Sequence, residues 1–177
     1  MRNGGGRDLP TSKLATRRAL PHIRPERPFL TLVIAYALSI TGSLLLSAII
    51  ATIDPAAKSP DFSWCVGRGI LTFFLLTVFS PLVETLILAA TTTVLLRFVN
   101  PKFAILLSSL GWALAHSYQA PIWGLVIWWP FIIFTTLFVV WKERSLAWGL
   151  FMPFAAHFLQ NLLTAIALGY PGLLPRF

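Results

Sequence analysis

Five long apolar runs, separated by short polar turns, organise the sequence. They are Phe29–Ile53, Ile70–Phe98, Phe103–Ala120, Trp123–Trp141 and Leu146–Gly169. A helix needs ~20 apolar residues to cross the ~30 Å hydrocarbon core of a bilayer, and the runs have about that length or more. The pattern predicts an all-α, polytopic membrane helix bundle with about five transmembrane helices. The second run contains Pro81, which kinks or divides a helix, so one span or two pieces remain open there.

Composition agrees with this interpretation. Of the 177 residues, 56% are hydrophobic and only 11% are charged, whereas ~25% of the residues in an average soluble domain are charged. The length fits a single domain. Because Cys65 is the only cysteine, an internal disulfide and a Cys-based metal site are both excluded. The chain is expected to be an integral membrane protein surrounded by the lipid bilayer.

A basic segment precedes the first run. Seven of the fourteen Lys and Arg residues lie in the first 27 positions, among several glycines and prolines, a composition typical of a disordered tail. We therefore divide the chain into a tail over 1–28, a transmembrane helical domain over 29–170 and a short C-terminal tail over 171–177. We expect no nucleic-acid partner, since no folded basic surface accompanies the tail. The first apolar run is too long for a signal peptide and lacks a small-residue cleavage site.

The distribution of basic residues predicts an orientation. If the second run spans once, the tail lies on the same side as the turn with Arg97 and Lys102 and the turn with Lys142 and Arg144. The positive-inside rule assigns this side to the cytoplasm. We expect a cytoplasmic N-terminus, the Pro55–Gly69 loop on the opposite side, and a location in the cell inner membrane.

Four polar side chains interrupt the apolar runs near their middles: Glu84, His116, His157 and Asn161. A charged group at the bilayer centre costs at least ~2.5 kcal/mol on insertion scales, so such residues are usually functional. Glu84, His116 and His157 each lie 13 or 14 residues from the basic turn that bounds their run, or ~20 Å at 1.5 Å per residue. Their shared depth predicts one common site.

The four residues suit hydrolysis, which needs a base to activate water and donors for the oxyanion. Glu84 is the only carboxylate inside the runs and is the candidate base, and His116 would hold the same water. His157 and Asn161 are four residues apart, share a helix face and would donate to the oxyanion. Alternatively, Glu84, His116 and His157 would be zinc ligands with water in the fourth position. The sequence therefore leaves open a site without a cofactor and a site with Zn.

Prolines accompany two of the polar centres. Pro81 stands three residues before Glu84, and Pro153 stands four residues before His157. Each proline lacks an N–H and frees a backbone carbonyl. Membrane helices tolerate this where neighbours or water satisfy the freed group, which indicates a pocket that contains water.

Two further patterns predict packing. Small residues recur every four positions at Ala35, Ser39, Ser43 and Ser47, a stripe that suits close helix–helix contact. Tryptophans near the ends of the predicted spans, Trp141 among them, are expected at the membrane interfaces.

The polar motifs resemble those of the CPBP family (CAAX protease and bacteriocin-processing, also called Abi) of intramembrane peptidases. The family pattern P-x-x-E-E-x-x-x-R aligns with Pro81–Ala89, the pattern aromatic-x-x-x-H with Trp112–His116, and the pattern H-x-x-x-N/D with His157–Asn161. Order and spacing match over roughly residues 70–169. Two positions depart from the pattern: Thr85 replaces the second Glu, and Ala89 replaces the Arg.

The resemblance implies an intramembrane endopeptidase, of the glutamate type, that cleaves a membrane-associated protein or peptide substrate. It assigns catalysis to Glu84, His116, His157 and Asn161. The two departures favour an alternative, a catalytically inactive relative that acts as a membrane binding or immunity protein. A proton-coupled transporter would use Glu84 and the histidines as a relay, but the sequence lacks the internal repeat typical of transporters.

Overall fold

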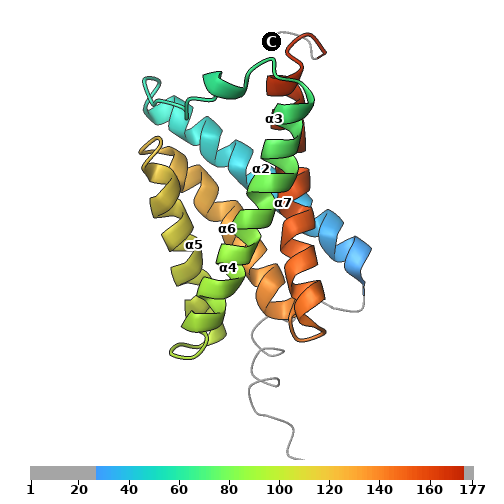
Figure 1. Ribbon diagram of the computed structural model, residues 1–177. Helices are drawn as coiled ribbons and strands as arrows, with labels where there is room; N and C mark the ends of the chain where they lie inside the picture. Colours follow the sequence, from blue (N-terminus) through green and yellow to red (C-terminus); the bar gives the residue numbers. More distant parts are fainter. Residues whose placement is uncertain (1–26, 174–177) are drawn as a thin grey trace, which may run out of the picture.

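The computed structural model describes residues 27–173, which form an all-α bundle without a strand (Figure 1). The helices are α2 (Pro28–Ile53), α3 (Ile70–Phe74), α4 (Ser80–Leu95), α5 (Pro101–Ser117), α6 (Trp123–Trp141) and α7 (Leu146–Gly169), with a π-helical turn, η2 (Leu75–Phe79), between α3 and α4 and a short 3-10 turn, η1 (Ser63–Cys65), before α3. The predicted fold class is confirmed. The predicted tail lies outside the described residues up to position 26, and so do positions 174–177 of the predicted C-terminal tail.

The five predicted runs correspond to the observed helices. Four helices are long and apolar enough to cross a membrane: α2, the continuous helix Ile70–Leu95, α6 and α7. The fifth, α5, has 17 residues and ends at Ser117. His116 therefore lies in the last turn of α5, and its predicted position near the middle of a span is wrong. The run Phe103–Ala120 is longer than its helix because Tyr118 to Ile122 form the turn to α6.

Pro81 does not divide the second run. The helix passes through η2, in which Ser80 N donates to Leu75 O, five residues earlier. Pro81 follows at once, within the first two positions of α4. A π-turn widens the helix locally and often marks a functional position. Here it lies one turn before Glu84.

The small-residue stripe of α2 packs as predicted at three of its four positions, whereas Ser47 is exposed. Ala35, Ser39 and Ser43 are buried, and the two serines bond to Gln160 of α7. Ser39 Oγ donates to Gln160 Oε1 at 2.8 Å, and Gln160 Nε2 donates to Ser43 Oγ at 3.3 Å. These interhelical hydrogen bonds join α2 to α7 within the apolar interior, where side-chain polar groups need partners.

α2 also contacts α6 through a glycine. Trp129 Nε1 donates to Leu38 O at 2.8 Å, which places the indole directly on Gly42. A Cβ at Gly42 would lie 2.0 Å from Trp129 Nε1. The absence of a side chain at Gly42 therefore permits both the ring contact and the hydrogen bond.

Aromatic side chains of α6 form the centre of the core. Phe131, Phe134, Phe138 and Trp141 are each 2% exposed or less. The prediction that Trp141 lies in the membrane interface is wrong, because its ring is fully buried and packs on Trp148 at 5.3 Å between centroids. It lies near the end of its span in sequence, but α7 covers it.

The loop before α3 covers the C-terminal end of α7. Gly67 N donates to Leu168 O at 2.7 Å and Gly69 N to Gly169 O at 2.9 Å, and both glycines have positive φ. The last carbonyls of a helix have no partner within it, so these two bonds satisfy groups that α7 leaves open. Positive φ is accessible to glycine at little cost, which suits this sharp loop.

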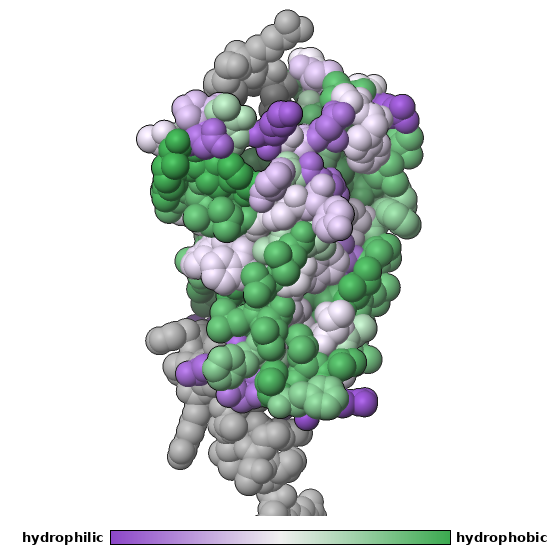
Figure 2. Space-filling view, turned by 90° about the vertical axis from the view of Figure 1, so that its left-hand side faces the viewer, coloured by the Kyte–Doolittle hydropathy of each residue, from purple (hydrophilic) through white to green (hydrophobic). Residues whose placement is uncertain are grey.

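Polar and apolar surfaces are separated along the bundle. In Figure 1 the α4–α5 and α6–α7 turns lie at the lower end, and the segment 54–69 lies at the upper end with the C-terminal end of α7. Figure 2 shows mainly hydrophobic atoms over the middle of one face and hydrophilic atoms at its top and bottom. Many large apolar side chains are exposed, among them Leu44, Leu114 and Leu163. This surface suits a protein embedded in lipid.

Gly42→Ala is expected to lower the free energy of unfolding by about 1–3 kcal/mol, because the new Cβ displaces the Trp129 ring and its hydrogen bond to Leu38 O. Gly111→Ala is the matched control, since a Cβ there meets nothing within 4 Å. Thermal unfolding of both variants in detergent would measure the difference. Equal melting temperatures would contradict the described contact between α2 and α6.

Candidate functional site

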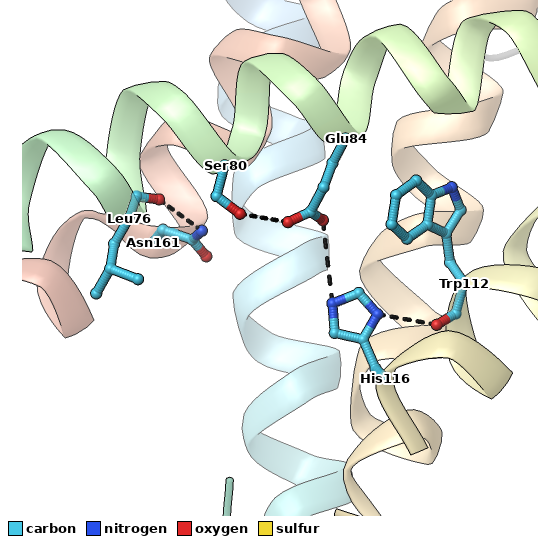
Figure 3. Close-up of polar contacts among 6 residues, drawn as sticks. All are labelled: Leu76, Ser80, Glu84, Trp112, His116 and Asn161. Atoms are coloured by element: carbon cyan, nitrogen blue, oxygen red, sulfur yellow. Dashed lines mark hydrogen bonds and ion pairs between the residues drawn. The ribbon is translucent and has the colours of Figure 1, made fainter. Parts of the chain in front are cut away.

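Glu84 and His116 face each other inside the bundle (Figure 3). Glu84 comes from α4 and His116 from the last turn of α5, and Oε2 of the carboxylate lies 4.0 Å from Nε2 of the imidazole. Their side chains are 17% and 13% exposed, respectively. Glu84 Oε2 is buried and has no hydrogen-bond partner among the described residues. The two residues that are most costly to place in lipid therefore form a pair, as their shared depth predicts.

The second carboxylate oxygen of Glu84 is bonded. Ser80 Oγ, one turn earlier on α4, donates to Glu84 Oε1. This bond orients the carboxyl group and distinguishes its two oxygens, so that Oε2 is the one that faces His116. Ser80 is not among the site residues that the sequence motifs predict. Its spacing of four residues before Glu84, on the same helix face, is the signal that identifies it.

A backbone carbonyl fixes the tautomer of His116. Nδ1 lies 2.9 Å from Trp112 O, one turn earlier on α5. A carbonyl oxygen only accepts, so Nδ1 carries the hydrogen and neutral His116 presents the lone pair of Nε2 to Glu84. Trp112 thus has a backbone role at the site, apart from its aromatic ring.

Aromatic rings surround His116. Trp123, Phe131 and Trp112 lie at centroid distances of 4.9, 5.5 and 5.8 Å from its ring. Trp123 also lines a cavity of about 180 Å³ between the C-terminal end of α2, the segment after it and the start of α6. The Trp123 side chain therefore contacts both this cavity and the imidazole of His116.

His157 enters the same aromatic cluster from α7. Its ring stacks on Phe134 at 4.8 Å and contacts Phe131 edge-on at 5.6 Å, so Phe131 contacts both imidazoles. His157 is 7% exposed, and no hydrogen bond or ion pair joins it to any described residue. His157 and His116 both contact the ring of Phe131, and His116 is the histidine that faces the Glu84 carboxylate.

Asn161 pairs with the π-turn. Its Nδ2 donates to Leu76 O at 2.9 Å. Pro81 lies five residues after Leu76 and has no N–H, so it cannot complete the π-type bond that Ser80 makes to Leu75 one position earlier. The Asn161 amide satisfies the carbonyl that Pro81 leaves open. Figure 3 shows the Asn161 amide on the Ser80 side of the Glu84 carboxylate.

Metal ligation was the alternative expectation for Glu84, His116 and His157. Within residues 27–173, no group of three His, Cys, Asp or Glu side chains is arranged so that it could hold a metal ion. Glu84 and His116 alone would supply two ligands. The Zn alternative stays a prediction.

Comparison of the chain with protein-family models, curated proteins and solved structures finds no match in any of the three.

Asn161→Ala is expected to destabilise the fold by about 1–3 kcal/mol, because the partly buried Leu76 carbonyl loses its donor. Pro81→Ala restores a backbone N–H near that carbonyl, so Asn161→Ala should cost less in the Pro81→Ala background than in the native chain. A double-mutant cycle on the free energy of unfolding measures this coupling. Strictly additive effects would show that the two residues do not serve the same carbonyl.

Proposed function

We propose that the protein is an intramembrane endopeptidase of the CPBP type that hydrolyses a peptide bond of a membrane-associated protein or peptide. The observation that carries this proposal is the Glu84–His116 pair, with Glu84 Oε2 buried, unbonded among the described residues and 4.0 Å from His116 Nε2. A buried carboxylate next to an imidazole is a suitable apparatus for removing a proton from water.

The separation of the pair suits a bridging water. A distance of 4.0 Å exceeds that of a direct hydrogen bond, and a water that bonds to both atoms would span it. Glu84 takes a proton from this water, and His116 Nε2 accepts the second O–H and orients the oxygen. The water oxygen then attacks the scissile carbonyl carbon. Glu84 afterwards returns the proton to the leaving amine.

The developing oxyanion needs N–H donors. His157 is the better candidate, because none of the described residues bonds to its ring nitrogens and a neutral imidazole always has one N–H. Asn161 uses one amide hydrogen on Leu76 O and retains a second. We assign stabilisation of the oxyanion to His157. We assign Asn161 two roles, as a second donor to the oxyanion and as the residue that fixes the π-turn before Glu84, and its hydrogen bond to Leu76 O supports the second role.

The three motifs that resemble the CPBP family support the proposal through these residues. The two departures face the interior: Thr85 is 3% and Ala89 is 7% exposed. A Glu and an Arg at these positions would place a second carboxylate and a guanidinium in the core beside the site. In this chain Glu84 acts without them, and Ser80 is the side chain that orients its carboxyl group.

One observation favours the alternative, an inactive relative that binds a partner in the membrane. His157 is packed against Phe134 and Phe131, an arrangement that also suits a structural histidine. Such a protein would retain its fold and its partner when Glu84 is replaced, and the native chain would cleave nothing.

We also propose the orientation in which the lower end in Figure 1 is cytoplasmic. The Arg97/Lys102 and Lys142/Arg144 turns lie there, and the positive-inside rule supports this assignment. In a bacterium the membrane would be the inner one.

Glu84→Gln should reduce cleavage roughly 100-fold or more, because an amide cannot accept the proton from water. Thr85→Ala, its neighbour on α4, is the matched control and should retain most of the activity. The assay uses purified protein in lipid with a panel of membrane-anchored peptides that includes prenylated CAAX peptides. Cleavage by Glu84→Gln at the native rate would refute the general base. Loss of activity on adding a chelator, followed by recovery on adding Zn, would favour the metal mechanism over general-base catalysis without a metal.

The proposed orientation is tested by labelling single cysteines in a Cys65→Ser background. A membrane-impermeant maleimide added to intact cells should label Ala56→Cys, in the segment after α2, and leave Phe98→Cys, in the α4–α5 turn, unlabelled until the cells are opened. Both positions are exposed. The reverse labelling pattern would place the basic turns outside the cell and contradict the proposed orientation.

A further inference from the structure

A groove separate from the Glu84–His116 pair runs between α2 and α6. It encloses about 390 Å³, within the range of ~300–1,000 Å³ that is usual for sites that bind small molecules. Its α2 wall includes Leu30, Ile34 and Leu38, and its α6 wall includes Ile132 and Ile133. Both helices are long and apolar enough to cross a membrane, so the groove lies at the depth of acyl chains.

The groove opens toward lipid. Leu30, Ile34 and Leu38 are 47%, 49% and 52% exposed although they line it. In Figure 1 the N-terminal end of α2, drawn in blue, extends away from the rest of the bundle past α7. A hollow in a surface that faces hydrocarbon is filled by hydrocarbon, because water cannot satisfy its hydrogen bonds there.

One end of the groove is cationic. Arg27 precedes the first residue of α2 and lines the cavity together with the leucines. From Arg27 to Leu38 the groove extends over eleven residues, or ~16 Å along the helix. The hydroxyl of Thr136 in the groove wall bonds to Ile132 O of its own helix at 2.7 Å, so this polar side chain does not require a polar ligand. The guanidinium of Arg27 is the charged group of the lining.

We infer that this groove binds an anionic phospholipid, with one acyl chain along the apolar walls and the headgroup phosphate at Arg27. The positive charge of Arg27 complements the headgroup phosphate, and the apolar walls behind it complement the acyl chain. Basic residues where a membrane helix meets the cytoplasmic surface attract anionic headgroups, and a guanidinium can bond a phosphate through two N–H groups. The bound lipid would contact the face of α6 opposite to the one on which Phe131 and Phe134 contact the histidines.

Native mass spectrometry of the full-length protein, released from mixed phosphatidylglycerol and phosphatidylcholine, tests the inference. We expect preferential retention of one phosphatidylglycerol. Arg27→Gln should lower this retention about fivefold relative to phosphatidylcholine, the effect of one basic residue near a membrane surface. Arg97→Gln, an exposed cation at the α4–α5 turn on the same side, is the matched control and should retain the lipid as the native chain does.

A second pair of variants tests the position of the acyl chain. Leu30→Trp fills the groove and should lower retention of both lipids, whereas Leu44→Trp, exposed on α2 outside the groove, should not. Thermal unfolding confirms that each variant is folded. Equal retention of the two lipids by the native chain, or native retention by Arg27→Gln, would overturn the proposal. A lipid-free groove occupied by the N-terminal segment of the chain or by a second copy would overturn it as well.

Discussion

Pairing of polar groups away from water is the constraint on which this structure depends. In hydrocarbon an unpaired backbone carbonyl costs several kcal/mol, so each break in a helix needs a donor from elsewhere in the protein. Pro81 creates such a break, and Asn161, 85 positions after Leu76, supplies the donor to Leu76 O. The same requirement explains why Gly67 and Gly69 donate to the last carbonyls of α7. Both interactions attach the helix Ile70–Leu95 or its preceding loop to α7.

The candidate site depends on that attachment. Glu84 lies one turn after the π-turn, and Ser80, whose amide closes the π-turn, orients the carboxylate with its hydroxyl. His116 lies in the last turn of α5, with its Nε2 4.0 Å from the carboxylate. The imidazole is in turn oriented by Trp112 O. Each member of the pair is therefore oriented by a residue four positions earlier on its own helix, whereas the contact between the two crosses from α4 to α5.

α6 separates two regions of different chemistry. Phe131 and Phe134 on one face contact the histidines, and Ile132, Ile133 and Thr136 on the other line the lipid-facing groove. Consecutive residues of a helix project about 100° apart, so adjacent positions serve different neighbours. The same helix also packs on α2 through Trp129 and Gly42. A substitution in α6 therefore affects the candidate site, the groove or the packing of α2, depending on the helix face that carries it.

The sequence by itself determined the fold class and the residues that cost most in lipid, because apolar length and the penalty for buried polar groups are properties of the local chain. It also indicated that Glu84 and His116 share a depth. Only the tertiary structure decided that His116 ends a short helix, that α7 buries Trp141 and that Asn161 pairs with Leu76. These three features depend on where each helix ends and on which helix faces pack against each other. The sequence spacing places Ser80 one turn before Glu84, but the tertiary structure decided that Ser80 bonds to Oε1 and that Oε2 faces His116.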